Sequence, residues 1–258
     1  METYEGYPIM PGIKSEILSS HKIKVKGAIL YRVQVEDKIK YVCVNAHTLR
    51  GRNIVIIPSF EGNEDANLVE IWRGQNGKFK YDFDIFPGVS PQHIWHRNQF
   101  DLSRLQKIDE ITENVSIVKL ADHTRTFIAK VKVVEPEEID LETRIYGLLR
   151  KTRITPRFMG HICEGEDVRG FLLEKVDAIA PLAIDFDACK RVLQTLHDYN
   201  WCLGKVTKDN FLIQTDGTAK LIGFGHCKTC SFPAGRRQWK LERKMLQELE
   251  TLRRLFKQ

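Results

Sequence analysis

The spacing of apolar residues changes near residue 135, and this change limits the classes of fold open to the chain. Before it, apolar and polar residues alternate in short segments rich in Val, Ile and Tyr, which predicts strands with one buried face. After it, segments with helical spacing appear between further strands. The sequence therefore predicts an α+β protein. Its 258 residues suffice for one large domain or two small ones.

The hydrophobic pattern places the expected strands at residues 22–35, 38–46, 53–60, 68–73, 78–84, 115–120, 126–134, 158–163, 169–176, 211–213 and 219–222. Helices are expected at about 135–149, where Pro136 and neighbouring acids mark a first turn, and at 187–199 and 236–256. Residues 85–95, which mix Pro, Gly and Ser, are typical of a linker, and Trp95-His96 is expected to anchor it. We expect a β-rich region over 1–103 and a second domain over 104–258.

Positive charge is concentrated in one segment. The net charge is +6, and residues 236–257 carry +5 of it, which leaves the remainder at +1. A nucleic-acid partner would have to bind this segment, but its aromatic residues do not alternate with the charges as base stacking requires. The apolar stripe of Met245, Leu249, Leu252 and Phe256 indicates packing against the body of the protein instead. Nucleic acid is therefore not the expected partner.

The sequence shows no targeting or metal-binding pattern. The longest stretch without Asp, Glu, Lys or Arg, residues 85–96, is too short to span a membrane. Residues 1–5 lack the basic start and apolar run of a secretory signal, so we expect an intracellular protein, cytoplasmic or nuclear. Cys227 and Cys230 have zinc-like spacing, but a structural zinc site needs four ligands. We expect free thiols and no metal.

Five fragments occur in an informative order: FIAK at 127–130, Glu142 twelve residues later, FLLE at 171–174, the segment 203–213 with Asn210, and LIGFG at 221–225. This order resembles the protein-kinase-like family, and in particular its compact aminoglycoside-phosphotransferase type, in which the catalytic loop reads His-Gly-Asp. The resemblance covers about residues 105–230. It implies a bilobal fold with a β-rich N-terminal extension, an N-lobe at about 104–176 and a reduced C-lobe at about 177–258.

The N-terminal segments 4–8, 29–33 and 41–44 are also similar to a fungal family of such proteins that often carries an α-galactosidase label. A glycosidase needs two carboxylates that flank a sugar site, and no such pair stands out in this sequence. The label therefore has no support from the residues.

The resemblance implies Lys130, Glu142, Glu174 and Asn210 as cofactor-binding residues. Lys130 would contact the phosphates of ATP, Glu142 would pair with Lys130, and Asn210 would help to hold magnesium. We expect Lys130 and Glu142 within salt-bridge reach, in a cleft also lined by Asn210 and Gly223. Taken alone, Lys130 and Glu142 could instead be ordinary surface charges.

No catalytic residue is intact. Lys205 stands at the catalytic Asp position, and a lysine, with a reference pKa of about 10.4, is a poor general base. Gly223 stands at the metal-binding Asp position, although magnesium usually requires carboxylates. No glycine occurs between Gly88 and Gly147, so the turn before Val115 lacks the residue that lets backbone amides approach phosphates. ATP and magnesium would be held poorly, and Asp209 and Asp216 are only weak candidates for replacement ligands.

The sequence therefore predicts a catalytically impaired kinase-like protein, a pseudokinase that acts as a binding or scaffold module with a protein partner. Two alternatives stay open. One is an atypical ATP-dependent phosphotransferase for a small molecule. The other is a nucleic-acid accessory protein that uses the basic C-terminal helix.

Overall fold

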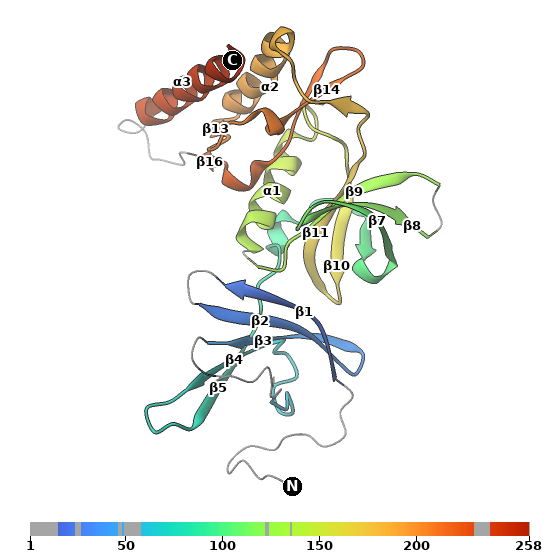
Figure 1. The fold of residues 1–258 in the computed structure, drawn as a ribbon, viewed down its shortest axis with the longest axis vertical. Helices are drawn as coiled ribbons and strands as arrows, with labels where there is room; N and C mark the ends of the chain where they lie inside the picture. Colours follow the sequence, from blue (N-terminus) through green and yellow to red (C-terminus); the bar gives the residue numbers. More distant parts are fainter. Residues whose placement is uncertain are drawn as a thin grey trace. The chain divides into compact units, whose positions relative to one another are not determined.

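The protein is an α+β chain that divides into two compact units, Met1–Pro87 and Gly88–Gln258 (Figure 1). The computed structural model describes residues 15–23, 27–45, 48, 58–121, 124–134, 136–229 and 238–257. Among these residues, no helix combines the length and the apolarity needed to cross a membrane.

The first unit is a five-stranded sheet in sequential order. Its strands are β1 (Ser15–Ile23), β2 (Ala28–Val35), β3 (Lys38–Val44), β4 (Leu68–Arg73) and β5 (Phe79–Asp84), and all pairs are antiparallel except β3–β4. Alternate residues of β2, β3 and β4 form its buried face, namely Tyr31, Val33, Val42, Val44, Val69 and Ile71. This pattern confirms the period-two interpretation of these segments.

The first unit differs from the expected strands at residues 22–35 and 53–60. The single strand expected at 22–35 is wrong, because the chain reverses between Ile23 and Ala28, and β1 and β2 pair as a hairpin. Gly27, just before β2, has a φ of 59°. A positive φ suits glycine and ends a strand. Of the segment 53–60, residues 53–57 lie outside the described residues and 58–60 form no strand.

The second unit contains a six-stranded sheet with the order β6-β10-β11-β9-β8-β7. Its strands are β6 (Gln99–Asp101), β7 (Leu105–Thr112), β8 (Val115–Leu120), β9 (Thr126–Val131), β10 (Phe158–Glu164) and β11 (Asp167–Glu174). In β11, Phe171 and Leu173 join one buried cluster while Leu172 joins another, so this strand is covered on both faces. Strand β7 was missed because seven of its eight residues are exposed, which removes the alternation that identifies strands.

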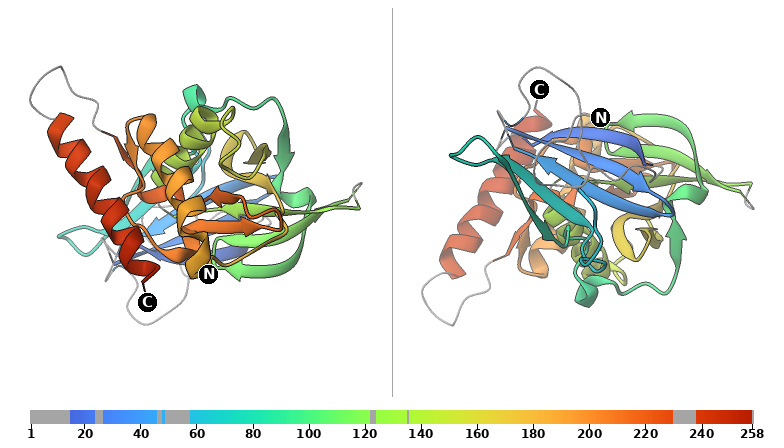
Figure 2. Two further views of the ribbon diagram at one scale, coloured as in Figure 1. Left: turned by 90° about the horizontal axis from the view of Figure 1, so that it is seen from above. Right: turned by 90° about the horizontal axis from the view of Figure 1, so that it is seen from below.

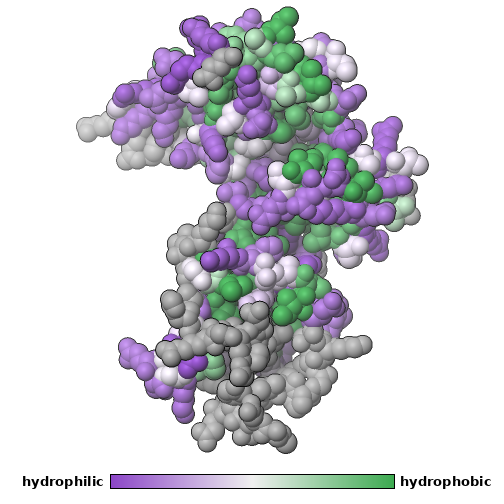
Figure 3. Space-filling view, in the orientation of Figure 1, coloured by the Kyte–Doolittle hydropathy of each residue, from purple (hydrophilic) through white to green (hydrophobic). Residues whose placement is uncertain are grey.

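Among the described residues, the rest of the second unit comprises three α-helices, a small three-stranded sheet and one two-stranded sheet. The helices are α1 (Pro136–Leu149), α2 (Phe186–Asp198) and α3 (Gln238–Leu255), each within about two residues of its expected range. The short strands are β12 (Ala178–Ile179), β13 (Trp201–Cys202), β14 (Phe211–Gln214), β15 (Ala219–Leu221) and β16 (Lys228–Thr229). Leu252 and Phe256 of the C-terminal segment join the core formed with α1 and α2. Helix α3, in red, lies beside α2, in orange (Figure 2). The opposite face of α3 is charged and exposed (Figure 3).

The boundary between the units lies at residues 87 and 88, not at 103 and 104 as the sequence suggested. Residues 88–103 pack on the rest of the second unit through several contacts, of which three are described here. The Ser90 backbone N–H donates to Asp140 over 2.8 Å, the Trp95 indole N–H donates to the Thr143 carbonyl over 2.9 Å, and β6 pairs in parallel with β10. A segment rich in Pro and Gly resembles a linker in composition even when its side chains are anchored. The expectation that Trp95 acts as an anchor agrees with these contacts.

Gly147 creates the space in which Trp95 packs on α1. A Cβ atom at residue 147 would lie 2.7 Å from the Trp95 indole nitrogen, closer than real Cβ contacts. Replacing glycine with alanine in a helix normally stabilises it by about 1 kcal/mol, but here we expect Gly147→Ala to lower the free energy of unfolding by about 1–3 kcal/mol through overpacking. In a Trp95→Ala background the same change should be neutral or stabilising. Chemical denaturation of the unmodified chain, the two single variants and the double variant measures this coupling. If the two changes in the free energy of unfolding simply add, the contact is refuted.

His161 gives the second unit a specific pH dependence. The side chain is fully buried in β10, its Nε2 accepts from the His96 backbone N–H over 3.1 Å, and burial lowers its pKa to about 4. Between pH 6.5 and 4 the unfolded chain is protonated at this residue while the folded chain is not, so the free energy of unfolding falls as pH falls through this window. The whole shift corresponds to at most about 3 kcal/mol.

We expect His161→Phe to flatten the pH dependence of unfolding between pH 6.5 and 4, whatever the variant costs at neutral pH. Denaturation curves at several pH values measure the slope. His226→Gln, at an exposed histidine, serves as the matched control and should keep the original slope. Equal slopes for His161→Phe and the unmodified chain would show that His161 is not the titrating group.

Candidate functional site

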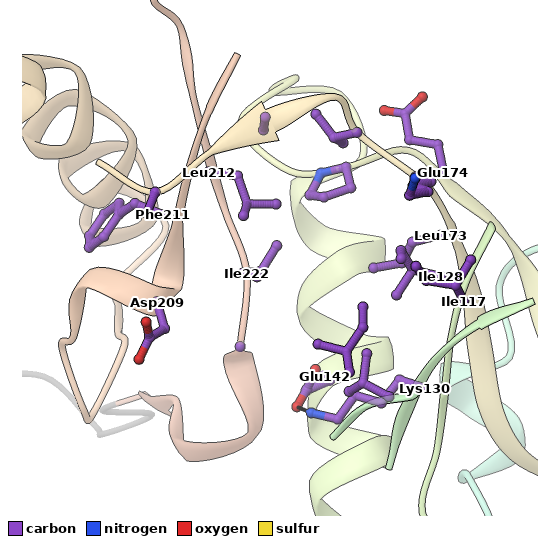
Figure 4. A pocket seen from close by; sticks show the side chains of 18 of the residues that line it. Ile117, Ile128, Lys130, Glu142, Leu173, Glu174, Asp209, Phe211, Leu212 and Ile222 are labelled. Carbon is purple, nitrogen blue, oxygen red and sulfur yellow. Dashed lines mark hydrogen bonds and ion pairs between the residues drawn. The ribbon is translucent and has the colours of Figure 1, made fainter. Parts of the chain in front are cut away.

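A cavity of about 500 Å³ lies in the second unit (Figure 4). One wall comes from β8, β9 and β11 through Ile117, Ile128 and Leu173, and the facing wall comes from Leu212 of β14 and Ile222 after β15. Most of the residues that line it are apolar. The charged ones are Lys130, Glu142, Glu174, Lys175, Lys208 and Asp209.

Lys130 and Glu142 form an ion pair at one end of the cavity (Figure 4). A second pair runs beside it, from Lys132 Nζ to Glu138 Oε2 over 2.7 Å. Glu138 and Glu142 are four residues apart on α1 and so share a face of the helix, while Lys130 lies in β9 and Lys132 directly follows this strand. The two ion pairs tie the end of β9 to α1.

Glu142 is almost completely enclosed, with 2% of its side chain exposed against 21% for Lys130. Burial raises the pKa of the Glu142 carboxyl, and the nearby Lys130 ammonium acts in the opposite direction. The alternative interpretation of Glu142 as an ordinary exposed helix acid is therefore wrong. A buried carboxylate of this kind needs a cation beside it.

The turn that carries Phe224 and Gly225 packs directly on this ion pair. Phe224 is fully buried, with its ring 5.1 Å from that of Tyr146 in an edge arrangement. A Cβ atom at residue 225 would lie 2.9 Å from Oε1 of Glu142 and 3.3 Å from Oε2 of Glu138. Glycine at 225 therefore allows the turn to approach the two carboxylates.

Asn210 is bonded within its own loop. Its Oδ1 accepts from the Thr207 backbone N–H over 2.9 Å and from the Thr207 hydroxyl over 3.1 Å, while its Nδ2 donates to the Ile222 carbonyl over 3.1 Å. An amide oxygen has two lone pairs, and both are used here. The amide of Asn210 therefore holds the loop to the segment after β15, and it is not among the described residues that line the cavity.

Gly223 lies against the Asn210 amide and does line the cavity. Its φ is 82°, in the left-handed region, and a Cβ atom there would lie 2.7 Å from Nδ2 of Asn210. Both features favour glycine. A carboxylate at this position would have to overcome backbone strain and a steric clash.

The remaining candidate residues lie apart from the ion pair. Lys205 is exposed and is not one of the described residues that line the cavity, whereas Asp209 is exposed at its edge. Glu174 lies at the far end, where Oε1 accepts from the Arg157 backbone N–H over 2.8 Å. Asp216 accepts from Thr218 in a turn. Within the described part of the chain, no three His, Cys, Asp or Glu side chains are grouped so as to hold a metal ion.

Sequence reasoning missed a buried carboxylate in α3. Glu248 Oε2 lies 2.9 Å from Nε2 of His197 and accepts from the Leu203 backbone N–H over 3.0 Å, and Oε1 accepts from the Gly204 N–H over 2.7 Å. Glu248 therefore fixes the start of the loop that leads to Asn210. The signal was present, since Glu248 falls three residues after Met245 and four before Leu252, on the apolar stripe of the helix.

No protein-family model matches the sequence, and no curated protein does. Among solved structures, the kinase PK-1 of the Cydia pomonella granulovirus is similar, with a TM-score of 0.41 and 15% sequence identity. The match covers 52% of this chain and 56% of that kinase, so the chain spans little more than half the length of that protein.

The Glu248 contacts predict a large effect from a small change. In Glu248→Gln only one side-chain oxygen remains, and the new NH₂ group faces a backbone N–H donor, so we expect a loss of about 2–4 kcal/mol in the free energy of unfolding. Glu250→Gln, at an exposed acid two residues away, should change it by less than about 0.5 kcal/mol. Chemical denaturation compares the two variants. Similar stabilities would show that the bonds to Leu203 and Gly204 contribute little.

Proposed function

We propose that the second unit is a protein-kinase-like domain without phosphotransfer activity, and that the chain acts as a pseudokinase-type binding or scaffold protein. The observation that carries this proposal is the contact between Asn210 and Gly223. A bonded amide and a left-handed glycine occupy the two positions at which the resemblance implies magnesium ligands, and this supports the proposal.

The ion pair of Lys130 and Glu142 supports the kinase-like part of the proposal, because the two residues occupy the order and spacing of the kinase motifs and meet in space. Lys205 supports the loss of activity. A general base must accept a proton near neutral pH from a hydroxyl within hydrogen-bond reach, and an exposed lysine is unsuited to this role.

The turn between β7 and β8 supports weak binding of phosphates. This turn consists of Glu113 and Asn114, and the Asn114 carbonyl accepts from the Val131 backbone N–H over 3.0 Å. In the kinase pattern a glycine-rich loop covers the phosphates at this place. A carboxylate there repels phosphate, and residues with a Cβ atom keep backbone amides farther from it.

A protein is the partner in this proposal. Three bulky apolar side chains, Ile179, Leu182 and Ile184, are 62%, 60% and 88% exposed in one short segment beside the cavity. Grouped exposed apolar residues are typical of interaction surfaces. They support a binding role that needs no chemistry in the cavity.

The proposal predicts no magnesium-dependent ATP turnover by the purified chain. Base and metal ligand act as one unit, so Lys205→Asp and Gly223→Asp should each remain inactive. The double variant should also fail, because Gly223→Asp places a side chain in the left-handed region at a cost of about 1–3 kcal/mol and against the Asn210 amide. Its lower melting temperature, compared with Lys205→Asp alone, measures that strain.

Turnover assays use the unmodified chain, the three variants and Lys130→Ala. Magnesium-dependent turnover by the unmodified chain that Lys130→Ala abolishes would overturn the proposal. It would favour an atypical small-molecule phosphotransferase instead. Thermal shifts with ATP, with and without magnesium, report binding separately from turnover, because a ligand that binds only the native state raises the melting temperature.

A further inference from the structure

We infer that the cavity of the second unit binds an uncharged, largely apolar small molecule, without magnesium. The inference names the ligand class of the cavity and rests on the proposed absence of phosphotransfer there. Its evidence is the composition of the walls, the pairing of the charges and the position of two exposed isoleucines.

The two facing walls are apolar over most of their area. Ile117, Ile128 and Leu173 project from the sheet side toward Leu212 and Ile222 on the other side (Figure 4). The volume of about 500 Å³ falls within the range of pockets that hold drug-sized ligands. Water between such walls is released when an apolar molecule takes its place, and this release favours binding.

The charges around the cavity leave no net attraction for an anion. The lining contains three lysines and three acids, so its formal charge is 3 − 3 = 0. Lys130 forms an ion pair with the buried Glu142, and Glu174 accepts a hydrogen bond from the Arg157 backbone N–H. A neutral ligand needs no counter-charge from this lining.

Two large apolar side chains that line the cavity remain exposed. Ile111 is 55% exposed and Ile179 is 62% exposed. Ile111 faces no partner residue on β8, because the β7–β8 register shifts between Glu110 and Thr112. A bulge of this kind commonly re-aims a side chain. A ligand in the cavity would cover apolar surface on both residues.

The test uses the full chain and N-phenyl-1-naphthylamine, a neutral aromatic probe that fluoresces more strongly in apolar surroundings. We expect saturable binding with the same affinity in the presence of magnesium or of a chelator. Ile117→Trp and Leu212→Trp fill the cavity from opposite walls and should each weaken binding by about tenfold or more. Leu246 of α3 does not line the cavity and is 62% exposed, so Leu246→Trp should leave the affinity unchanged.

Hydrogen exchange of the unmodified chain provides a measurement that does not depend on the variants folding. Probe binding should slow exchange in β8 and β14. Lack of saturable binding, equal weakening by Leu246→Trp, or protection confined to other segments would each overturn the inference. If the probe fails and ATP turnover is also absent, only the ligand class is wrong. Magnesium-dependent ATP turnover would overturn the proposed function as well.

Discussion

The second unit depends on the burial of a charged helix residue beside a lysine of the sheet. Glu142 cannot be enclosed as an ion without a cation, and Lys130 supplies one from β9. This requirement fixes how α1 lies along the sheet, because a shift by one residue on the strand would turn Lys130 to the other face. The same contact then limits the turn at Phe224 and Gly225, which approaches Glu142 closely. One electrostatic constraint thus positions a strand, a helix and a loop.

A second buried carboxylate performs a similar task at the other end of the unit. Glu248 of α3 accepts hydrogen bonds from the backbone at Leu203 and Gly204 and contacts His197 of α2. Because buried N–H groups are costly without acceptors, these bonds fix the path of the loop. α3 is therefore more than a basic surface helix. Its inner face belongs to the scaffold of the cavity, while its outer face is charged and exposed.

These contacts form the framework of the cavity in the second unit, which under the proposed function lacks reactive groups for phosphotransfer. The strand lysine and the helix glutamate meet, whereas Asn210 bonds to its own loop and Gly223 has a backbone conformation that disfavours other residues. Such a framework can persist without catalytic activity when its contacts also stabilise the fold. The Lys130–Glu142 pair and the Asn210–Ile222 bond do so here, since each joins segments distant in sequence.

The sequence by itself determined the fold class, all three described helices and most strands, because their apolar periodicity follows from which face is buried. It also predicted an ion pair between Lys130 and Glu142, from the order of these residues among the other motifs. Tertiary structure decided the rest. Strand β7 has no buried face, so its sequence lacks the alternation that identifies a strand. The anchoring of residues 88–103 depends on the space that Gly147 leaves for Trp95. The hydrogen bonds of Asn210 depend on the positions of Thr207 and Ile222. Each of these features needs a partner distant in sequence or an exact backbone conformation, and local residue patterns encode neither.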